Sequence, residues 1–325
     1  MTTIRRSPLS VQSNPSQPRS AVTQTESATA PPPASSFDPV AKFNRLVEAV
    51  RRFTDPVSAI TNSAKRTDWF NAPLEVKGIS GETDVKQGSL GDCYMVATVA
   101  AIAHQHPQRI RDRMRENSDG TVTFTFFRKD AWNRLEPHEV TVTRELPMRE
   151  DGSLPFGQSG EHEAWFPLLE KAYAQFKGGV QAIGNGGFPS DAQEALLGTT
   201  PRESEVAGSE PSALFAQLER DLAAGRIVTV TTPPKTGTTL VRTLLDAFRA
   251  TVSGVIPQHV YSVWGTQDVE GRKYVLLRNP WARSEPGSFG PLGSFSRDGK
   301  NDGVFAMPVE EFARRFSWLS SAAVE

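Results

Sequence analysis

Apolar and polar positions along the chain follow both helical and strand-like patterns. Residues 93–101 are almost all apolar and rich in alanine, which predicts a buried helix that begins near residue 93. Residues 211–224 carry apolar side chains at helical spacing and predict an amphipathic helix. Runs rich in β-branched and aromatic residues predict strands at 121–127, 139–143 and 226–231, the first two as a pair. The pattern therefore predicts a mixed α+β fold.

Two further strand-like runs, 258–265 and 272–281, flank a segment of turn residues and predict an antiparallel hairpin. With the centre of the hairpin near Val269, His259 lies opposite Asn279, because both are equally far from the centre. Directly opposed residues project to the same face, so we expect these two side chains to be neighbours. The proline after Asn279 is a strand-ending signal, which places the Asn279 amide at the edge of the sheet.

Three regions differ in composition. Residues 1–37 are dominated by Ser, Thr, Pro, Gln and Ala and cannot bury enough apolar surface to order themselves, so we expect a disordered leader. Residues 38–66 begin with an aspartate and a proline, a helix-start signal, and predict an amphipathic helix and linker. The remaining part, 67–320, is expected to be one globular domain of two lobes, mainly helical at 67–205 and rich in strands at 206–320.

Composition and charge argue against several classes of protein. Hydrophobic residues make up 38% and charged residues 22%, which is enough for a sizeable core. The formal net charge of −1 gives no reason to expect nucleic acid as a partner. No apolar run is long enough for a membrane span. The chain has one cysteine, which excludes an intramolecular disulfide and fits a reducing compartment, so we expect a cytoplasmic protein. The acid-poor leader also resembles the export leaders of bacterial effectors, and export is the alternative.

The single cysteine, Cys93, is expected at the first turn of the helix that begins there. Unpaired backbone N–H groups and the helix dipole favour an anion at this position, and the thiolate is the form of cysteine that attacks carbonyls. Taken alone, a lone cysteine is more often a small buried hydrophobe, and a sheet histidine is often only hydrogen-bonded. A cysteine on a helix N-terminus with His259 and Asn279 far downstream is, however, the arrangement of a papain-like thiol protease.

These residues lie within motifs that resemble the protease core of the calpain family. The family signature Gln-Gly-x-Leu-Gly-Asp-Cys is matched from Gln87 to Cys93 without a gap, with Tyr94 where the family usually has Trp. Further matches follow in the family's order, at 163–173, 184–187, 278–281 and 302–307. The resemblance runs from about Trp69 to Leu319. The Cys-Gly-x-Cys-Trp and Asn-Ser-Trp motifs of simpler papain relatives are absent.

The resemblance implies a papain-like two-lobe cysteine protease fold and an endopeptidase that cleaves proteins or peptides. It implies that Cys93 is the nucleophile, that His259 is its acid–base partner and that Asn279 orients His259. The other implied site residues are Gln87 in the oxyanion hole, Gly186 and Gln258 as backbone contacts to an extended substrate, and Trp281 as a shield for the His259–Asn279 bond.

The resemblance also implies one calcium site near the cleft. Asp84, nine residues before Cys93, and Glu163 occupy the family's ligand positions, and their oxygens suit a hard cation. A second site of the family is poorer here, because Val304 replaces a carboxylate, although Glu285 and Asp302 match. Alternatively, all these carboxylates are solvated loop residues, and Lys86 could replace the ion.

Two alternatives keep the same fold but change the function. One is a catalytically silent binding module, and the intact set of Gln87, Cys93, His259 and Asn279 argues against it. The other is a deamidase or acyl-transferase that uses the same triad. The substrate and the oligomeric state stay open at this point.

Overall fold

The computed structural model describes residues 68–71, 78–149, 154–160, 163–234, 255–283 and 300–324, the first range by its backbone alone. The chain divides into two compact units, Met1–Lys42 and Phe43–Glu325, and all described residues belong to the second. The leader expected at 1–37 and the helix expected at 38–66 therefore lie outside the described residues, and both stay predictions.

The described elements comprise helices and strands in alternating groups. The helices are α3 (Cys93–Gln105), α4 (Pro107–Asp112), α5 (Trp165–Lys177), α6 (Val180–Gly184), α7 (Pro189–Leu197), α8 (Pro211–Ala223) and α10 (Val309–Arg315). The strands are β1 (Asp68–Asn71), β2 (Met114–Glu116), β3 (Val122–Lys129), β4 (Leu135–Val142), β5 (Glu145–Met148), β6 (Arg202–Glu205), β7 (Ile227–Thr231), β8 (Val260–Val269), β9 (Arg272–Arg278), β10 (Val304–Pro308) and β11 (Trp318–Ala322).

The described strands form antiparallel sheets. The largest has six strands in the order β10-β9-β8-β7-β11-β6, a second has the order β2-β3-β4, and β1 pairs with β5. These sheets and the helices around them confirm the mixed α+β class.

Several elements agree with the sequence pattern. The helix expected at 211–224 is α8, whose buried residues include Leu214 and Leu218 on one face. The strands expected at 121–127 and 139–143 pair as β3 and β4, with Val122 opposite Val142. Here the pattern was sufficient because periodic apolar residues pack on one side of each element.

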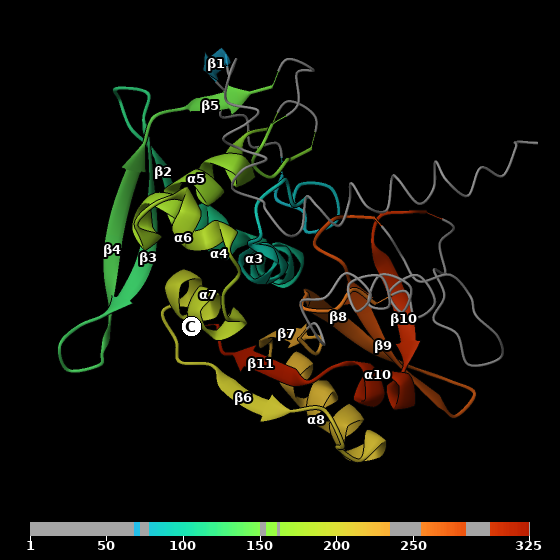
Figure 1. The fold of residues 1–325 in the computed structure, drawn as a ribbon. Coiled ribbons are helices and arrows are strands. Elements are labelled where there is room, and N and C mark those ends of the chain that lie inside the picture. Colours follow the sequence, from blue (N-terminus) through green and yellow to red (C-terminus); the bar gives the residue numbers. More distant parts are fainter. Residues whose placement is uncertain are drawn as a thin grey trace, which may run out of the picture. The chain divides into compact units, whose positions relative to one another are not determined.

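The six-stranded sheet is the platform for the region around Cys93. Helix α3 packs against β7 and β8, and α7 packs against β7 and β11, while α8 contacts β7 and β8 and α10 contacts β9 and β10 (Figure 1). Helix α3 thus packs against β8, although more than 150 residues separate their first residues in the chain. This contact joins the two segments that carry the predicted catalytic residues.

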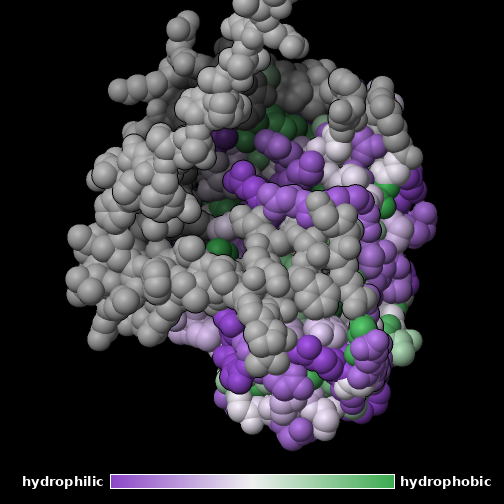
Figure 2. All heavy atoms as spheres, turned by 90° about the vertical axis from the view of Figure 1, so that its right-hand side faces the viewer, coloured by the Kyte–Doolittle hydropathy of each residue, from purple (hydrophilic) through white to green (hydrophobic). Residues whose placement is uncertain are grey.

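Buried apolar residues form two clusters. One draws mainly on 85–197 and includes nearly the whole of α3 and α5, whereas the other draws on 206–319, from α8, α10 and the large sheet. The lobe boundaries expected from the sequence stay a prediction. Hydrophilic residues make up most of the coloured surface in Figure 2, and hydrophobic ones come through at small separate places. Among the described residues, none of the helices has the length and apolar character needed to cross a membrane.

Candidate active site

Cys93 is the first residue of α3, as expected, and follows Asp92 at the N-cap position. The helix from Tyr94 to Ala103 is buried because its apolar side chains face the core on nearly all sides. Cys93 itself stays partly exposed. The backbone N–H of Val260, the residue after His259, is near enough to the Cys93 sulfur to lower the pKa of the thiol. The nucleophile candidate therefore lies directly against the start of β8.

The hairpin that carries His259 and Asn279 is present, but its predicted register was wrong. The turn is a tight pair, Glu270-Gly271, with φ of 54° and 81°, and Val269 pairs with Arg272. The centre of the hairpin is therefore displaced toward the C-terminus from Val269. Two consecutive residues with positive φ form the kind of turn that matches the twist of a hairpin. Sequence reasoning missed it because Glu is unusual at such a position.

Although the predicted register was wrong, a β-bulge in β8 makes His259 and Asn279 neighbours as predicted. Gly265 pairs with Leu276, and continuing this register would put Asn279 opposite Ser262, on the face away from His259. The register shifts between Val263 and Gly265, and Ser262 pairs with Arg278 instead. One extra residue in a strand reverses the faces of all residues beyond it. The bulge thereby returns His259 and Asn279 to a common face.

His259 is held by two neighbours. Its Nε2 lies 3.1 Å from Oδ1 of Asn279, which also accepts the backbone N–H of Trp281 at 3.1 Å. The ring centres of His259 and Trp281 are 4.9 Å apart. Because the amide oxygen can only accept, Nε2 carries the proton in this pair, and Nδ1 keeps its lone pair when the ring is neutral. Such an imidazole is ready to take a proton at Nδ1.

The charges of the cysteine and the histidine differ from the expectation of a stabilised thiolate. Burial, with a smaller contribution from the charge of Asp92, raises the pKa of the Cys93 thiol to about 12 despite the lowering effect of the N–H groups of Val260 and of the helix start. Burial lowers the pKa of His259 to about 4, although the Asn279 bond opposes this. Desolvation outweighs the helix dipole here, so both groups are neutral near pH 7 in this structure.

The loop before Cys93 is fixed to the end of β9 by hydrogen bonds. The backbone N–H of Gln87 donates to the carbonyl of Pro280 at 2.9 Å. Arg278 is fully buried, and its Nη2 donates to the carbonyls of Val85 at 2.6 Å and Glu82 at 3.3 Å. These bonds join the loop of the oxyanion candidate to the strand of the triad asparagine.

Trp264, the bulged residue, contacts both α3 and Arg278. Its ring stacks on His104 of α3 with ring centres 4.0 Å apart, and the guanidinium of Arg278 lies 5.4 Å from the Trp264 ring centre. Sequence reasoning assigned no role to Arg278 or Trp264. The sequence did contain a signal for Arg278, because it is a charged residue directly after the apolar run 274–277. A charged side chain is rare in a buried strand unless it has partners.

The other predicted site residues lie around this centre. The Nε2 of Gln87 donates to the carbonyl of Leu90 at 2.8 Å and to Oδ1 of Asp92 at 3.3 Å, so both amide protons are engaged within the loop in this state. Gly186 is exposed with φ of 89°, and a Cβ placed on it would meet no atom within 4 Å. Gln258 is exposed, and its N–H donates to the carbonyl of Pro233 at 2.9 Å. The roles of these residues stay predictions.

The two predicted calcium ligands belong to adjoining loops. Lys86 and Gln158 form a β-bridge, and a Cβ on Gly160 would lie 2.8 Å from Oδ1 of Asp84. The N–H of Glu163 donates to the carbonyl of Gly160 at 3.2 Å.

The oxygens near Asp84 supply only part of what a calcium ion requires. Asp84 is nearly fully buried, and its oxygens already accept bonds from Ser80 N at 2.8 Å and Thr83 Oγ1 at 2.5 Å. Calcium takes roughly six to eight oxygens, whereas the described residues contain no group of three or more His, Cys, Asp or Glu that could hold a metal. The donors fit in kind, but a site here would need backbone carbonyls. At the family's second calcium site, Oδ1 of Asp302 accepts the N–H of Val304 at 3.0 Å, and Glu285 lies outside the described residues.

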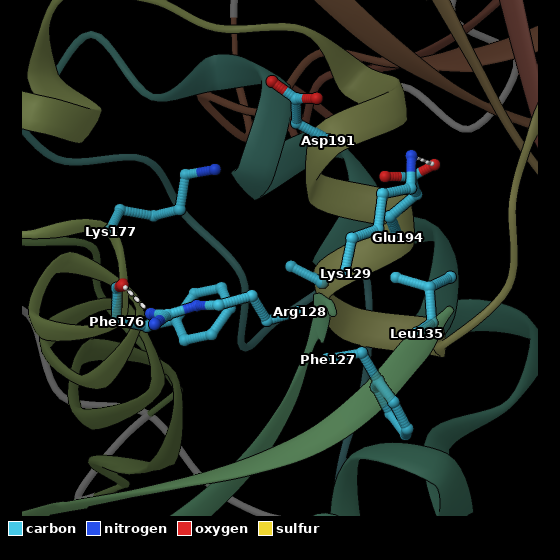
Figure 3. Close-up of a pocket in the computed structure, with 9 residues that line it drawn as sticks. Phe127, Arg128, Lys129, Leu135, Phe176, Lys177, Asp191 and Glu194 are labelled. Carbon is cyan, nitrogen blue, oxygen red and sulfur yellow. Dashed lines mark hydrogen bonds and ion pairs between the residues drawn. The ribbon is translucent and has the colours of Figure 1, made fainter. Parts of the chain in front are cut away.

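A cavity of about 250 Å³ lies elsewhere, among β3, β4, α5 and α7 (Figure 3). Lys129 pairs with Glu194 at 2.6 Å, and Nη2 of Arg128 donates to the carbonyl of Phe176 at 3.1 Å. None of the triad candidates lines this cavity. It is therefore separate from the candidate active site.

Comparison with known proteins identifies the class. The family described as calpain family cysteine protease matches residues 58–289, more than half of the chain. The chain therefore belongs to the calpain family of cysteine proteases and carries its protease domain, as the motif resemblance predicted.

Individual calpains show the same relationship at moderate identity. The chain is 30% identical over 229 residues to the calpain-2 catalytic subunit of Bos taurus, covering 67% of this chain and 31% of that protein. It is 28% identical over 269 residues to the calpain-2 catalytic subunit of Mus musculus, covering 76% and 36%. Calpain-8 of Mus musculus is 27% identical over 274 residues, covering 78% and 37%. The chain thus spans about a third of the length of these relatives.

Proposed function

We propose that the chain is a calpain-type cysteine endopeptidase with a papain-like two-lobe fold and a Cys93–His259–Asn279 triad. The observation that carries this proposal is the junction of α3 and β8. There α3, which begins at Cys93, packs against β8, and His259 directly before β8 is oriented by Asn279 at 3.1 Å. Membership of the calpain family supports a protein or peptide substrate.

Acylation begins with two neutral partners. The Cys93 sulfur bonds to the scissile carbonyl carbon while its proton passes to Nδ1 of His259, and the carbonyl oxygen takes up the electron pair of its broken π bond. The Nε2–H of His259 stays on Asn279, which stabilises the imidazolium that forms. The Trp281 ring beside His259 keeps water from the His259–Asn279 hydrogen bond. The tetrahedral intermediate collapses as the C–N bond breaks and His259 protonates the leaving amine, which leaves a thioester for water to hydrolyse.

The developing oxyanion is bound by the backbone N–H of Cys93 and the side-chain amide of Gln87. Because both Gln87 amide protons are engaged within the loop, one must turn toward the substrate when it binds. An extended substrate strand lies along the exposed Gly186 and reaches the carbonyl of Gln258.

Calcium is proposed as a single bridge between the loops of Asp84 and Glu163. The adjoining positions of these loops support it. When bound, the ion would stabilise the arrangement of the two loops, and it would take no part in the proton transfers.

Two rival functions keep the same residues and are separated by one experiment. Purified wild-type protein and Cys93→Ala are incubated with a peptide library, and the products are identified by mass spectrometry. Cleavage of internal peptide bonds by the wild type alone supports the endopeptidase. Unchanged peptides would favour the silent binding module, and a mass gain of one dalton or an acyl adduct would favour the deamidase or acyl-transferase.

A further inference from the structure

Two carboxyl groups lie inside the protein immediately behind the candidate nucleophile. Asp92 precedes Cys93, and Glu170 lies in the middle of α5, and both side chains are 0% exposed. The two carboxyl groups are close enough that each shifts the pKa of the other. Two buried carboxylates in contact repel strongly, so an arrangement with both ionised is not stable without a cation.

No basic side chain compensates this pair among the described residues. The titratable groups that interact electrostatically with Asp92 are Glu170, Cys93, Tyr94 and Tyr173, and all of them are acids. None of the described ion pairs includes Asp92 or Glu170. The charge must therefore be reduced by a proton held within the pair.

The hydrogen bonds show which atoms would share that proton. Oε2 of Glu170 accepts the N–H of Gly157 at 2.6 Å, and Oδ1 of Asp92 accepts from Nε2 of Gln87 at 3.3 Å. The remaining oxygens, Glu170 Oε1 and Asp92 Oδ2, are buried, and neither has a hydrogen-bond donor among the described groups. A buried acceptor without a donor is rare in a native structure. One proton between the two carboxyls satisfies both oxygens at once.

We propose that Asp92 and Glu170 share one proton, carried by Glu170, and act as a positioning pair for Gln87 and the start of α3. In this arrangement Glu170 donates to Asp92, and the single charge rests on Asp92 at the end of a chain from Gly157 to Gln87. This inference rests on the proposed function only in that Gln87 is the oxyanion donor. The pKa shifts of the two groups agree with a proton on Glu170. Burial and the charge of Asp92 raise the pKa of Glu170 well above its usual range, whereas burial raises the pKa of Asp92 only to about 6.

The variant Glu170→Gln is a matched replacement for a protonated glutamate. Its amide oxygen can accept from Gly157 and its NH₂ group can donate to Asp92, so the chain of hydrogen bonds is retained without the titratable proton. Glu170→Leu instead leaves the N–H of Gly157 and an oxygen of Asp92 without partners. Glu219→Gln, the same chemical change at an exposed position of α8, is the control.

Infrared spectroscopy of the full chain at pH 7 tests the proton directly, because an ionised carboxylate lacks the carboxylic-acid C=O stretch. The band is expected in the wild type and in Glu219→Gln and is expected to be lost in Glu170→Gln. In peptide cleavage, Glu170→Gln should keep kcat within about threefold, whereas Glu170→Leu should lose about tenfold or more in kcat with little change in KM.

Three results would overturn the pairing: no acid band in the wild type, an unchanged band in Glu170→Gln, or a kcat of Glu170→Gln as low as that of Glu170→Leu. If the wild type cleaved no peptide, the proposed function would fail, while the infrared band would still decide whether the pair holds a proton.

Discussion

The Nε2 of His259 and the Oδ1 of Asn279 are 3.1 Å apart because a one-residue bulge at Trp264 places both side chains on the same face of the β8–β9 hairpin. Without the bulge, the register set by the turn would point the two side chains to opposite faces. The same Trp264 side chain stacks on His104 of α3. One residue therefore sets the geometry of the histidine–asparagine pair and attaches it to the helix of Cys93.

Deleting Trp264 tests this relationship. The deletion removes the bulge and should reverse the face of His259, so kcat should fall to the level of His259→Ala while the secondary structure persists. Trp264→Phe keeps the residue count and the stacking ring, and should stay within about tenfold of the wild type in kcat. Peptide cleavage and circular dichroism are the measurements. A folded deletion variant with full activity would show that the bulge does not orient the triad.

Arg278 is expected to hold the loop of Gln87 in place. Arg278→Met keeps most of the side-chain volume but removes the bonds to the carbonyls of Val85 and Glu82, so it should lower the free energy of unfolding by about 2 kcal/mol. Because the loop then loosens, kcat should fall more than KM rises. Denaturant unfolding and steady-state kinetics measure both effects. Arg111→Met, at an exposed position of α4, is the control and should change neither.

The buried neutral His259 predicts a specific dependence of stability on pH. Its pKa is lowered from 6.5 to about 4, so between these values the unfolded chain binds a proton that the native protein does not. The free energy of unfolding should therefore fall as the pH decreases from 6.5 to about 4, with a contribution of about 3 kcal/mol from this residue. Above 6.5 the contribution is constant.

Denaturant unfolding at a series of pH values measures this contribution. Replacing the histidine by glutamine, His259→Gln, should flatten the curve in that window relative to the wild type. The exposed His138→Gln should leave it unchanged. Parallel curves for His259→Gln and the wild type would mean that His259 is not buried in its neutral form.

Periodicity predicted the elements, but contacts between distant segments decided the details of the site. Helices α3 and α8 and the β3–β4 pair could be read from the sequence because each presents a regular apolar face. The hairpin register could not, because a bulge leaves no periodic signal and Glu270 is an unusual residue at positive φ. His259 and Asn279 were nevertheless predicted as neighbours, since an error of two residues in the register preserves the face.

Electrostatics was the least predictable part of the site. The sequence places Cys93 at a helix N-terminus, which favours a thiolate, but burial within the folded protein raises the pKa of the thiol. The Asp92–Glu170 pair could not be predicted from the sequence either, because it depends on how distant segments pack. Glu170 looked like one charge in a family motif, and only the fold brings it to Asp92 from another helix.

Calcium should act through one site. Adding calcium should raise activity and thermal stability together in a single non-cooperative step, because an ion bridging two loops favours the state in which both are in place. Asp84→Ala should abolish both responses, and Asp302→Ala should leave them unchanged. Calorimetric titration and thermal unfolding measure the effects. Full activity in excess chelator, equal in Asp84→Ala and the wild type, would show that the protease domain needs no calcium.

The most direct measurement is the intact mass of the protein after reaction with a thiol-directed peptidyl epoxide, combined with peptide cleavage. Because Cys93 is the only cysteine in the chain, the wild type should gain the mass of one inhibitor and lose all cleavage activity. Cys93→Ala should gain no mass and cleave nothing, and His259→Ala should react far more slowly. Cleavage by Cys93→Ala at a rate near that of the wild type would contradict the cysteine mechanism, since no other thiol could replace it.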